Sequence, residues 1–212
     1  MKTKIYIIAF LFVFTLISCK KENTFSEYKY ADKPLDLPCE NLNSKLYNEA
    51  LYSFEDDISN FYNKNKNSSL LRSYSQFIRA ALYNRAKYED IVSEHTFKVF
   101  EALKNDKDLW NLSNTTSHLN YNGALMDCIS KNIKDKDLKT TLNSLLTTNS
   151  MSPDLFGAPL VSSYSLALSD KALASYVAFD LYYAKLFDID FSKVNFDKPA
   201  NTVDFNKVPP KK

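Results

Sequence analysis

Glycine is almost absent from this chain of 212 residues, which contains only Gly123 and Gly157. A phosphate-binding loop and a dinucleotide-binding fingerprint each need several glycines close together, so the sequence excludes both. The zinc motif H-E-x-x-H, the redox motif C-x-x-C and the nucleophile motif G-x-S-x-G are absent as well. Scarce glycine, with few prolines inside the longer segments, favours an all-helical domain. We therefore expect an all-α fold with no cofactor and no metal site.

An excess of charge of either sign is also missing. The chain has 27 basic and 25 acidic residues, and Lys2 and Lys4 at the very start account for the difference. Nucleic-acid binding usually shows as a basic patch and a high isoelectric point. Attachment to a membrane surface by charge needs a cluster of basic residues. We therefore expect no nucleic-acid partner and no purely electrostatic membrane binding.

The N-terminus combines a basic start with a short apolar run, Ile5 to Phe14. That order is typical of a secretion signal, and the run is shorter than the roughly 20 apolar residues of a transmembrane helix. The next residues, Leu16-Ile17-Ser18-Cys19, resemble the lipobox of bacterial lipoproteins, of the Bacteroidetes type. The resemblance implies removal of residues 1–18 and a membrane anchor of fatty acids, palmitate among them, on Cys19. The alternative is an ordinary signal peptide or an uncleaved anchor, but no A-x-A-like cleavage pattern follows.

The residues after Cys19 bear on the destination of the protein. Lys20, in place of aspartate, is similar to the residue that sorts lipoproteins to the outer membrane. The stretch Lys20-Lys21-Glu22 resembles the basic and acidic surface-export signals of Bacteroidetes, with one acidic residue. The resemblance implies an outer-membrane lipoprotein, on the periplasmic face or on the cell surface.

Three further regions follow the signal sequence. Residues 19–42 are polar with Pro34 and Pro38, and we expect the lipidated cysteine and a flexible tether, spanning about 25 Å. Residues 43–191 show helical periodicity and form the domain. Residues 192–212 have three prolines and no apolar periodicity, which predicts an extended or disordered tail.

Apolar spacing within the domain predicts an antiparallel bundle of about five or six helices. The predicted helices cover residues 44–62, 69–104 (one long helix or two nearly collinear ones), 119–133, 137–148 and 169–187. The last of these begins at the capping pair Ser169-Asp170 and is apolar nearly all round, so we expect it to be buried at the centre of the bundle.

The segment 151–168 is the least regular part of the domain, with two prolines and Gly157. It is also apolar, at Leu155, Phe156, Leu160 and Val161. Long structureless connections are uncommon in compact domains and are often functional. We therefore expect a loop that contacts a protein partner.

The three arginines, Arg72, Arg79 and Arg85, fall in the first half of the helix predicted over 69–104. Arg72 and Arg79 share a face opposite the apolar stripe. Because a guanidinium matches carboxylates and phosphates, this face is either an anion-binding site or a solvated surface paired with acidic residues 55–57. Arg85 lies on the apolar stripe itself, which predicts a structural ion pair with Asp180 of the buried last helix.

The only two histidines, His95 and His118, are the candidates for acid–base chemistry. A general base needs a carboxylate or nucleophile within hydrogen-bond reach. The chain neighbour of His95, Glu94, points elsewhere on a helix, so spacing favours a structural histidine. His118 falls at a predicted helix start, where it would serve as part of a cap. Two histidines so placed do not predict a metal site.

Cys39 and Cys128 remain once Cys19 is assigned to lipid. In an exported chain an even pair of cysteines can form a disulfide. The alternative is two independent thiols, with Cys128 packed as a small apolar residue. Sequence alone leaves both open.

The absent catalytic motifs and the tethered helical domain favour a non-enzymatic interaction or accessory module of the cell envelope, with a protein partner. An immunity or inhibitor protein with one tightly bound cognate protein is an alternative. The opposing hypothesis is a hydrolase of unrecognised type that uses His95 or His118.

Overall fold

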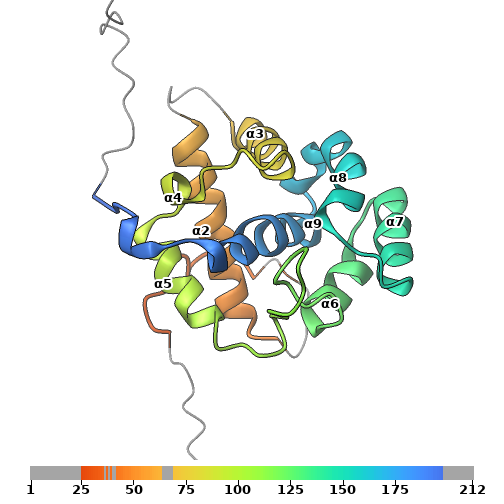
Figure 1. Cartoon of the computed structure of the whole chain (residues 1–212), viewed down its shortest axis with the longest axis horizontal. Helices are drawn as coiled ribbons and strands as arrows, with labels where there is room; N and C mark the ends of the chain where they lie inside the picture. The colour runs from red at the N-terminus through yellow and green to blue at the C-terminus, as the bar shows by residue number, and fades with distance from the viewer. Residues whose placement is uncertain (1–24, 36, 38, 40–41, 64–68, 198–212) are drawn as a thin grey trace, which may run out of the picture.

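The computed structural model describes residues 25–35, 37, 39, 42–63 and 69–197 (Figure 1). The fold is all-α, as the composition predicts. Its α-helices are α2 (Ser44–Tyr62), α3 (Leu70–Leu82), α4 (Tyr88–Ile91), α5 (Glu94–Leu103), α6 (Ala124–Asn132), α7 (Lys136–Thr147), α8 (Pro153–Ser162) and α9 (Lys171–Tyr176). Shorter helical segments are η2 (Tyr164–Leu168), η3 (Val177–Tyr182), η4 (Tyr183–Asp188) and η5 (Phe191–Lys193). Residues 1–24, with Cys19 and the lipobox, and residues 198–212 lie outside the described part, so the anchor stays a prediction.

The C-terminal helical segment forms the centre of the molecule. It begins where the Asp170 side chain caps α9 by accepting a hydrogen bond from Leu173 N at 3.1 Å. It continues through the π-helical η3 and the 3-10 helix η4, and residues 172–184 are all buried. Figure 1 shows it crossing α2 at a steep angle, with the other helices around the pair. The prediction of a buried helix over 169–187 is therefore confirmed.

The first helix of the domain follows its apolar spacing. Asn43 caps α2 by accepting a hydrogen bond from Leu46 N at 3.2 Å. Tyr47, Leu51, Phe54 and Ile58, which recur at helical spacing, are all buried against the central segment and α3.

The long helix predicted over 69–104 is three separate helices, α3, α4 and α5. Asn84 has φ of 53°, the left-handed conformation that ends α3. The chain then changes direction before α4 and α5 (Figure 1). Each of the three short helices buries its own apolar face. That these faces follow one helical spacing across the break is a coincidence.

The segment 151–168 is helical as well, which corrects the expected loop. Ser152 caps α8 by accepting a hydrogen bond from Leu155 N at 3.2 Å, and Pro153 occupies the first turn, where a proline costs little. Pro159 lies inside the helix without ending it. Gly157 faces Leu82 of α3 so closely that an added Cβ would lie 3.0 Å from a leucine methyl carbon. Pro153 and Gly157, which predicted a loop, therefore serve a helix start and a close helix contact.

Parts of the predicted tether and of the predicted tail belong to the folded domain. Residues 25–35 pack on the domain, because the Glu49 carboxylate accepts hydrogen bonds from Lys29 N at 2.7 Å and Tyr30 N at 3.0 Å. At the other end, the rings of Phe191 and Phe196 lie 4.5 and 5.7 Å from the ring of Phe97. The flexible tether over 19–42 and the disordered tail over 192–212 are thus wrong for residues 25–35 and 192–197.

Candidate ligand-binding pocket

A cavity of about 540 Å³ opens between a long loop and the junction of α7 with α8. The loop supplies Asn111, Ser113, Asn114, Thr116, Tyr121 and Asn122. The junction supplies Leu146, Asn149, Ser150, Met151 and Ser152. These lining residues are all uncharged, and most carry an amide or a hydroxyl. We call this cavity the polar pocket.

The loop of the polar pocket is held in shape by its own backbone and by asparagine side chains. Its two ends pair as an antiparallel bridge, in which Asn111 N donates to His118 O at 2.7 Å and Asn120 N donates to Leu109 O at 2.9 Å. At the tip, Asn111 Oδ1 accepts hydrogen bonds from the backbone and the hydroxyl of Ser113, and Asn114 Oδ1 accepts the equivalent pair from Thr116. Such asparagine turns fix a loop without regular secondary structure.

The opposite wall is set by the end of α7. Asn149 has φ of 51°, so the backbone turns out of the helix in the left-handed conformation that asparagine tolerates. Ser150 N then donates to Leu145 O at 3.0 Å, and the chain leads directly to the Ser152 cap of α8. Met151 between them is 6 % exposed and anchors this wall in the core.

A buried carboxylate supports the pocket from below. Asp180, fully buried in η3, accepts hydrogen bonds at Oδ1 from Ser117 Oγ at 2.5 Å and from Tyr121 OH at 3.0 Å. Burial raises the pKa of Asp180 above its usual range, although the hydroxyls of Ser117, Tyr176 and Tyr121 oppose the rise. Burial, and then the charge of Asp180, raise the pKa of Tyr121, so the phenol keeps its proton and donates. Tyr121 is therefore held in one orientation at the wall of the pocket.

Four asparagine side chains in the lining keep hydrogen-bonding capacity for a ligand. The Nδ2 atoms of Asn111 and Asn114, and the whole side-chain amides of Asn122 and Asn149, make no hydrogen bond to any described residue. An amide carries two N–H donors and an oxygen acceptor. The pocket thus offers donors and acceptors together, without a charge of either sign.

Both histidines have a carboxylate partner outside the pocket lining. His95 Nε2 lies 2.6 Å from Glu49 Oε1, so the expectation that His95 lacks such a partner is wrong. The rings of Phe25 and Tyr30 lie 6.2 and 6.0 Å from the imidazole, and the same carboxylate holds the N-terminal segment. This arrangement fixes the segment to the domain.

His118 lies at the base of the pocket loop, with Nε2 at 3.2 Å from Asp188 Oδ1 and the ring 5.3 Å from the ring of Phe187. It is not at the start of a helix, because α6 begins only at Ala124. Its contacts join the loop to the end of the C-terminal helical segment.

The predicted ion pair between Arg85 and Asp180 is wrong. Arg85 follows the turn at Asn84, is exposed, and places its guanidinium 5.2 Å from the ring centre of Tyr83. The hydrogen-bond partners of Asp180 are hydroxyl groups, as given above. The stripe that placed Arg85 in the core assumed a continuous helix, and the break after α3 removes that assumption.

Arg72 and Arg79 are exposed on α3, and no ion pair joins either of them to a carboxylate of the described residues. The acidic residues proposed as their partners are engaged elsewhere. Glu55 pairs with Lys171 Nζ at 2.9 Å, and Asp57 accepts a hydrogen bond from Tyr182 OH at 2.7 Å. The anion-binding and solvated-face interpretations both stay open for the two arginines.

The apolar segment predicted to bind a partner is divided between core and surface. Phe156 and Leu160 are fully buried, Val161 is half-buried, and Leu155 is exposed. The Phe156 and Leu160 side chains therefore pack α8 on the core and are not available to a partner. A single exposed leucine does not make an apolar patch.

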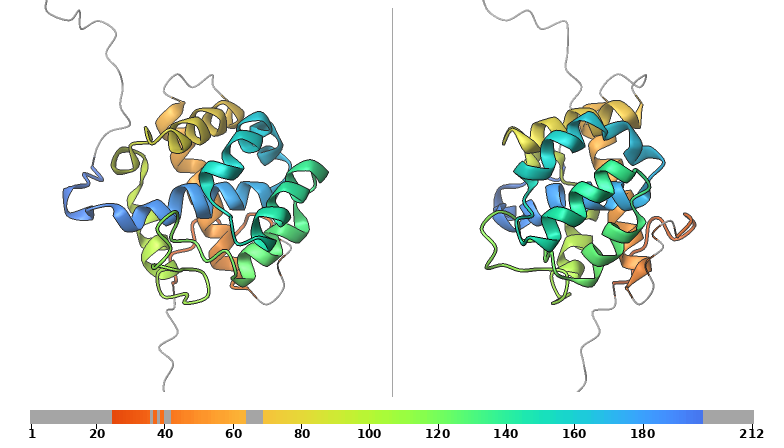
Figure 2. Two further views of the ribbon diagram at one scale, coloured as in Figure 1. Left: turned by 45° about the vertical axis from the view of Figure 1, so that its right-hand side comes forward. Right: turned by 90° about the vertical axis from the view of Figure 1, so that its right-hand side faces the viewer.

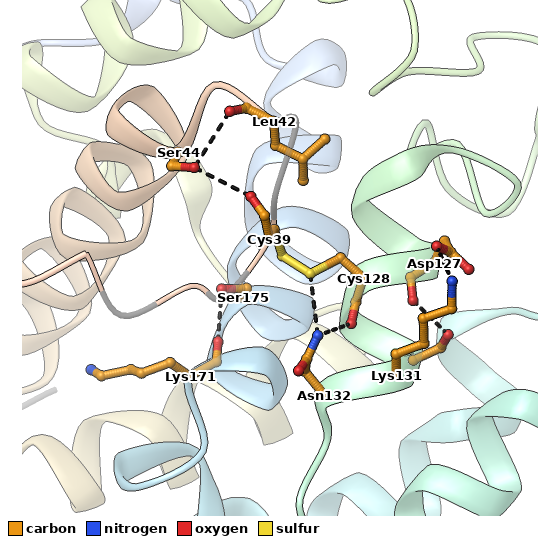
Figure 3. The surroundings of a disulfide bond; sticks show 10 residues. Cys39, Leu42, Ser44, Asp127, Cys128, Lys131, Asn132, Lys171 and Ser175 are labelled. Carbon is orange, nitrogen blue, oxygen red and sulfur yellow. Dashed lines mark hydrogen bonds and ion pairs between the residues drawn. A yellow bond between two sulfur atoms is a disulfide. The ribbon is translucent and has the colours of Figure 1, made fainter.

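Cys39 and Cys128 form a disulfide that joins the chain before α2 to α6 (Figure 3). Their Cα atoms are 5.7 Å apart, in the usual range for a bridge. Asn132 Nδ2 donates to Cys128 O at 2.9 Å, and Ser44 Oγ donates to Cys39 O at 3.3 Å. The bridge thus holds the start of α2 against α6, the helix that follows the pocket loop.

Sequence reasoning missed the polar pocket, although the sequence holds a signal for it. Residues 109–126 and 140–153 contain no Asp, Glu, Lys or Arg, in a chain of which 25 % is charged. These two uncharged segments meet in space and together supply the whole lining.

Three further findings concern function. Within the described residues, no cluster of three or more histidine, cysteine or acidic side chains could hold a metal ion. No helix in the same part of the chain is both long and apolar enough to cross a membrane. Comparison with protein-family models, curated proteins and solved structures finds no match to this chain.

Proposed function

We propose that this protein is a lipoprotein of the bacterial outer membrane, anchored through Cys19, that acts as a non-enzymatic binding module of the cell envelope. The observation that carries the binding role is the polar pocket, which combines free amides with a rigid lining. The lining contains no histidine, cysteine, carboxylate or lysine that would act as a base, nucleophile or acid. A lining of amides and hydroxyls favours recognition of a ligand over its transformation.

The length of the attachment supports a pocket directed away from the membrane. Cys19 precedes Phe25, the first described residue, by only six residues, which span at most about 20 Å. The N-terminal segment and the loop of the polar pocket lie on opposite sides of the molecule in the right-hand view of Figure 2. A lipid on Cys19 therefore keeps one side of the domain close to the membrane and leaves the pocket open to the surroundings.

The disulfide supports the same compartment. Structural disulfides form and persist outside the reducing cytoplasm, in the periplasm and at cell surfaces. A bridge between Cys39 and Cys128 is consistent with export by the N-terminal signal.

A hydrolase that uses His95 or His118 is the enzymatic alternative. The contact of His95 with Glu49 supplies the carboxylate that a general base needs. However, Glu49 also holds the backbone of Lys29 and Tyr30, and this gives the pair a structural role. An immunity or inhibitor protein would need a large partner interface. The exposed large apolar residues of the described part come from separate elements, which does not favour such an interface: Leu35, Tyr83, Leu112, Leu155 and Leu168.

Labelling in the native cell tests the proposed anchor. Cells fed an alkyne analogue of palmitate should label the wild-type protein and the variant Cys128→Ala, which keeps the lipobox. The variant Cys19→Ala should carry no label and should leave the membrane fraction. Equal labelling of Cys19→Ala would contradict the anchor.

A further inference from the structure

The charge of the polar pocket narrows the class of ligand that it can take. Proteins bind anions through Arg, Lys or the backbone N–H groups of a helix start, and hard cations mainly through carboxylates. The lining has none of these charged side chains, and Asp154 in the first turn of α8 disfavours an anion at the start of that helix. The ligand that fits is therefore uncharged.

The hydrogen-bonding groups of the lining narrow the class of ligand further. Asn122 and Asn149 each present a complete amide, and Asn111 and Asn114 each add two N–H donors. A ligand that matches them must donate and accept at closely spaced positions. Neighbouring hydroxyl groups do both, since each hydroxyl has one donor and two acceptor sites. Apolar ligands would leave these amides without partners at the moment of burial, which is unfavourable.

The remaining lining completes such a site. Leu146, Met151 and the ring of Tyr121 supply carbon surface against which the C–H groups of a ring can pack. Tyr121 is fixed by Asp180, and the loop by its two asparagine turns, so little ordering is needed on binding. The volume of about 540 Å³ lies within the roughly 300–1,000 Å³ of small-molecule pockets.

We infer that the polar pocket binds a neutral carbohydrate, through the amides of Asn111, Asn114, Asn122 and Asn149 with Tyr121 as the fixed wall. This inference rests on the proposed binding function and names its ligand class. The recognition is of paired hydroxyl groups on an uncharged sugar, and it involves no covalent step.

Calorimetric titration of the full-length protein tests the inference. The protein is kept in a polyoxyethylene detergent, which has no sugar headgroup. The probes are neutral hexasaccharides of α-glucan, β-glucan, xylan, mannan and chitin, with hyaluronan and polygalacturonate oligosaccharides as anionic comparators. The pocket variants are Asn122→Ala and Asn149→Gly, the second of which keeps the left-handed backbone. The matched control is Asn60→Ala, an exposed asparagine on α2.

We expect saturable binding of at least one neutral hexasaccharide and none of the anionic ones. Each pocket variant should weaken binding about fivefold, the loss of one ordinary hydrogen bond, with an unchanged unfolding midpoint. Asn60→Ala should bind as the wild type does. The inference is overturned if no neutral hexasaccharide binds, or if both pocket variants bind as tightly as the wild type.

The same samples separate this inference from the proposed function. New reducing ends on a bound hexasaccharide would contradict the non-enzymatic role and would support the ligand class. Absence of carbohydrate binding by a protein that is labelled with lipid at Cys19 would refute the ligand class and leave the anchor in place.

Discussion

Reduction of the bridge between Cys39 and Cys128 should lower the stability of the domain by a large and calculable amount. The two cysteines are separated by 89 residues, so the bridge closes a long loop of the unfolded chain. In the chain-entropy model a loop of this length contributes about 4–5 kcal/mol to the free energy of unfolding. For a domain of this size the corresponding fall in the unfolding midpoint is on the order of 10 °C. Both cysteines sit in packed surroundings, with Cys39 only 5 % exposed, so local rearrangement on reduction is small.

The assay is guanidinium unfolding followed by far-ultraviolet circular dichroism, with and without a reductant. The chain from Lys20 onward, secreted through an unrelated signal, avoids the lipid and the third cysteine. The double variant Cys39→Ala/Cys128→Ala is the matched control and should show no effect of the reductant. A reductant effect below about 1 kcal/mol on the wild-type chain would refute the argument, because the bridge would then constrain little of the unfolded state.

Four other substitutions follow from named residues of the structure. Burial raises the pKa of Asp57 to about 6, so its ionisation disfavours the folded state as the pH rises from about 4 to 6. In urea unfolding, the free energy of unfolding of Asp57→Asn should rise by about 2 kcal/mol relative to that of the wild type between pH 4 and pH 7, and an unchanged difference would contradict this. Glu49→Ala should release the N-terminal segment, residues 25–35, because the Glu49 carboxylate accepts the hydrogen bonds that hold it. Limited proteolysis would detect the release as faster cleavage within this segment, and cleavage at the wild-type rate would contradict the role of Glu49. Gly123→Ala should lower the free energy of unfolding by about 1–3 kcal/mol, because its Cβ would lie 2.5 Å from the backbone oxygen of Asp108. In Gly157→Ala the added Cβ meets a movable leucine methyl group, so this variant should lose less free energy of unfolding than Gly123→Ala. Urea unfolding of both variants measures the two losses, and a larger loss for Gly157→Ala would contradict this packing.

Local patterns predicted the elements that depend on neighbouring residues. The spacing of Tyr47, Leu51, Phe54 and Ile58 predicts α2 and its buried face, since helical periodicity alone decides which side faces the core. The capping residue Asp170 likewise predicts the start of the central helical segment, because a cap acts within one turn.

Sequence patterns gave wrong predictions where packing between distant residues decides whether a helix ends or continues. Asn84 ends α3 because its backbone is in the left-handed conformation. The apolar spacing on either side of Asn84 is the same as in an unbroken helix, so the sequence does not show this break. Pro159 contributed to the prediction of a loop over 151–168, although α8 continues through it. This helix packs against α3 and α7, and these contacts offset one missing hydrogen bond.

The sites needed contacts between residues far apart in the chain. Glu49 and His95 are 46 positions apart, and Ser117 and Asp180 are 63 apart. No spacing rule predicts such pairs, since they depend on how helices pack. The polar pocket has a trace in the sequence, in the two uncharged segments around Tyr121 and Asn149, but only the fold brings these segments together.

The most direct test of a carbohydrate-binding pocket is capture of the ligand in the native cell. A benzophenone amino acid in place of Leu146 would sit in the lining, and the same replacement at Asn60 would serve as the control. After irradiation, intact mass spectrometry should show an adduct with the mass of a neutral oligosaccharide on the protein that carries the probe at position 146, and none with the probe at position 60. Capture of a protein at position 146, or equal labelling at both positions, would contradict the account.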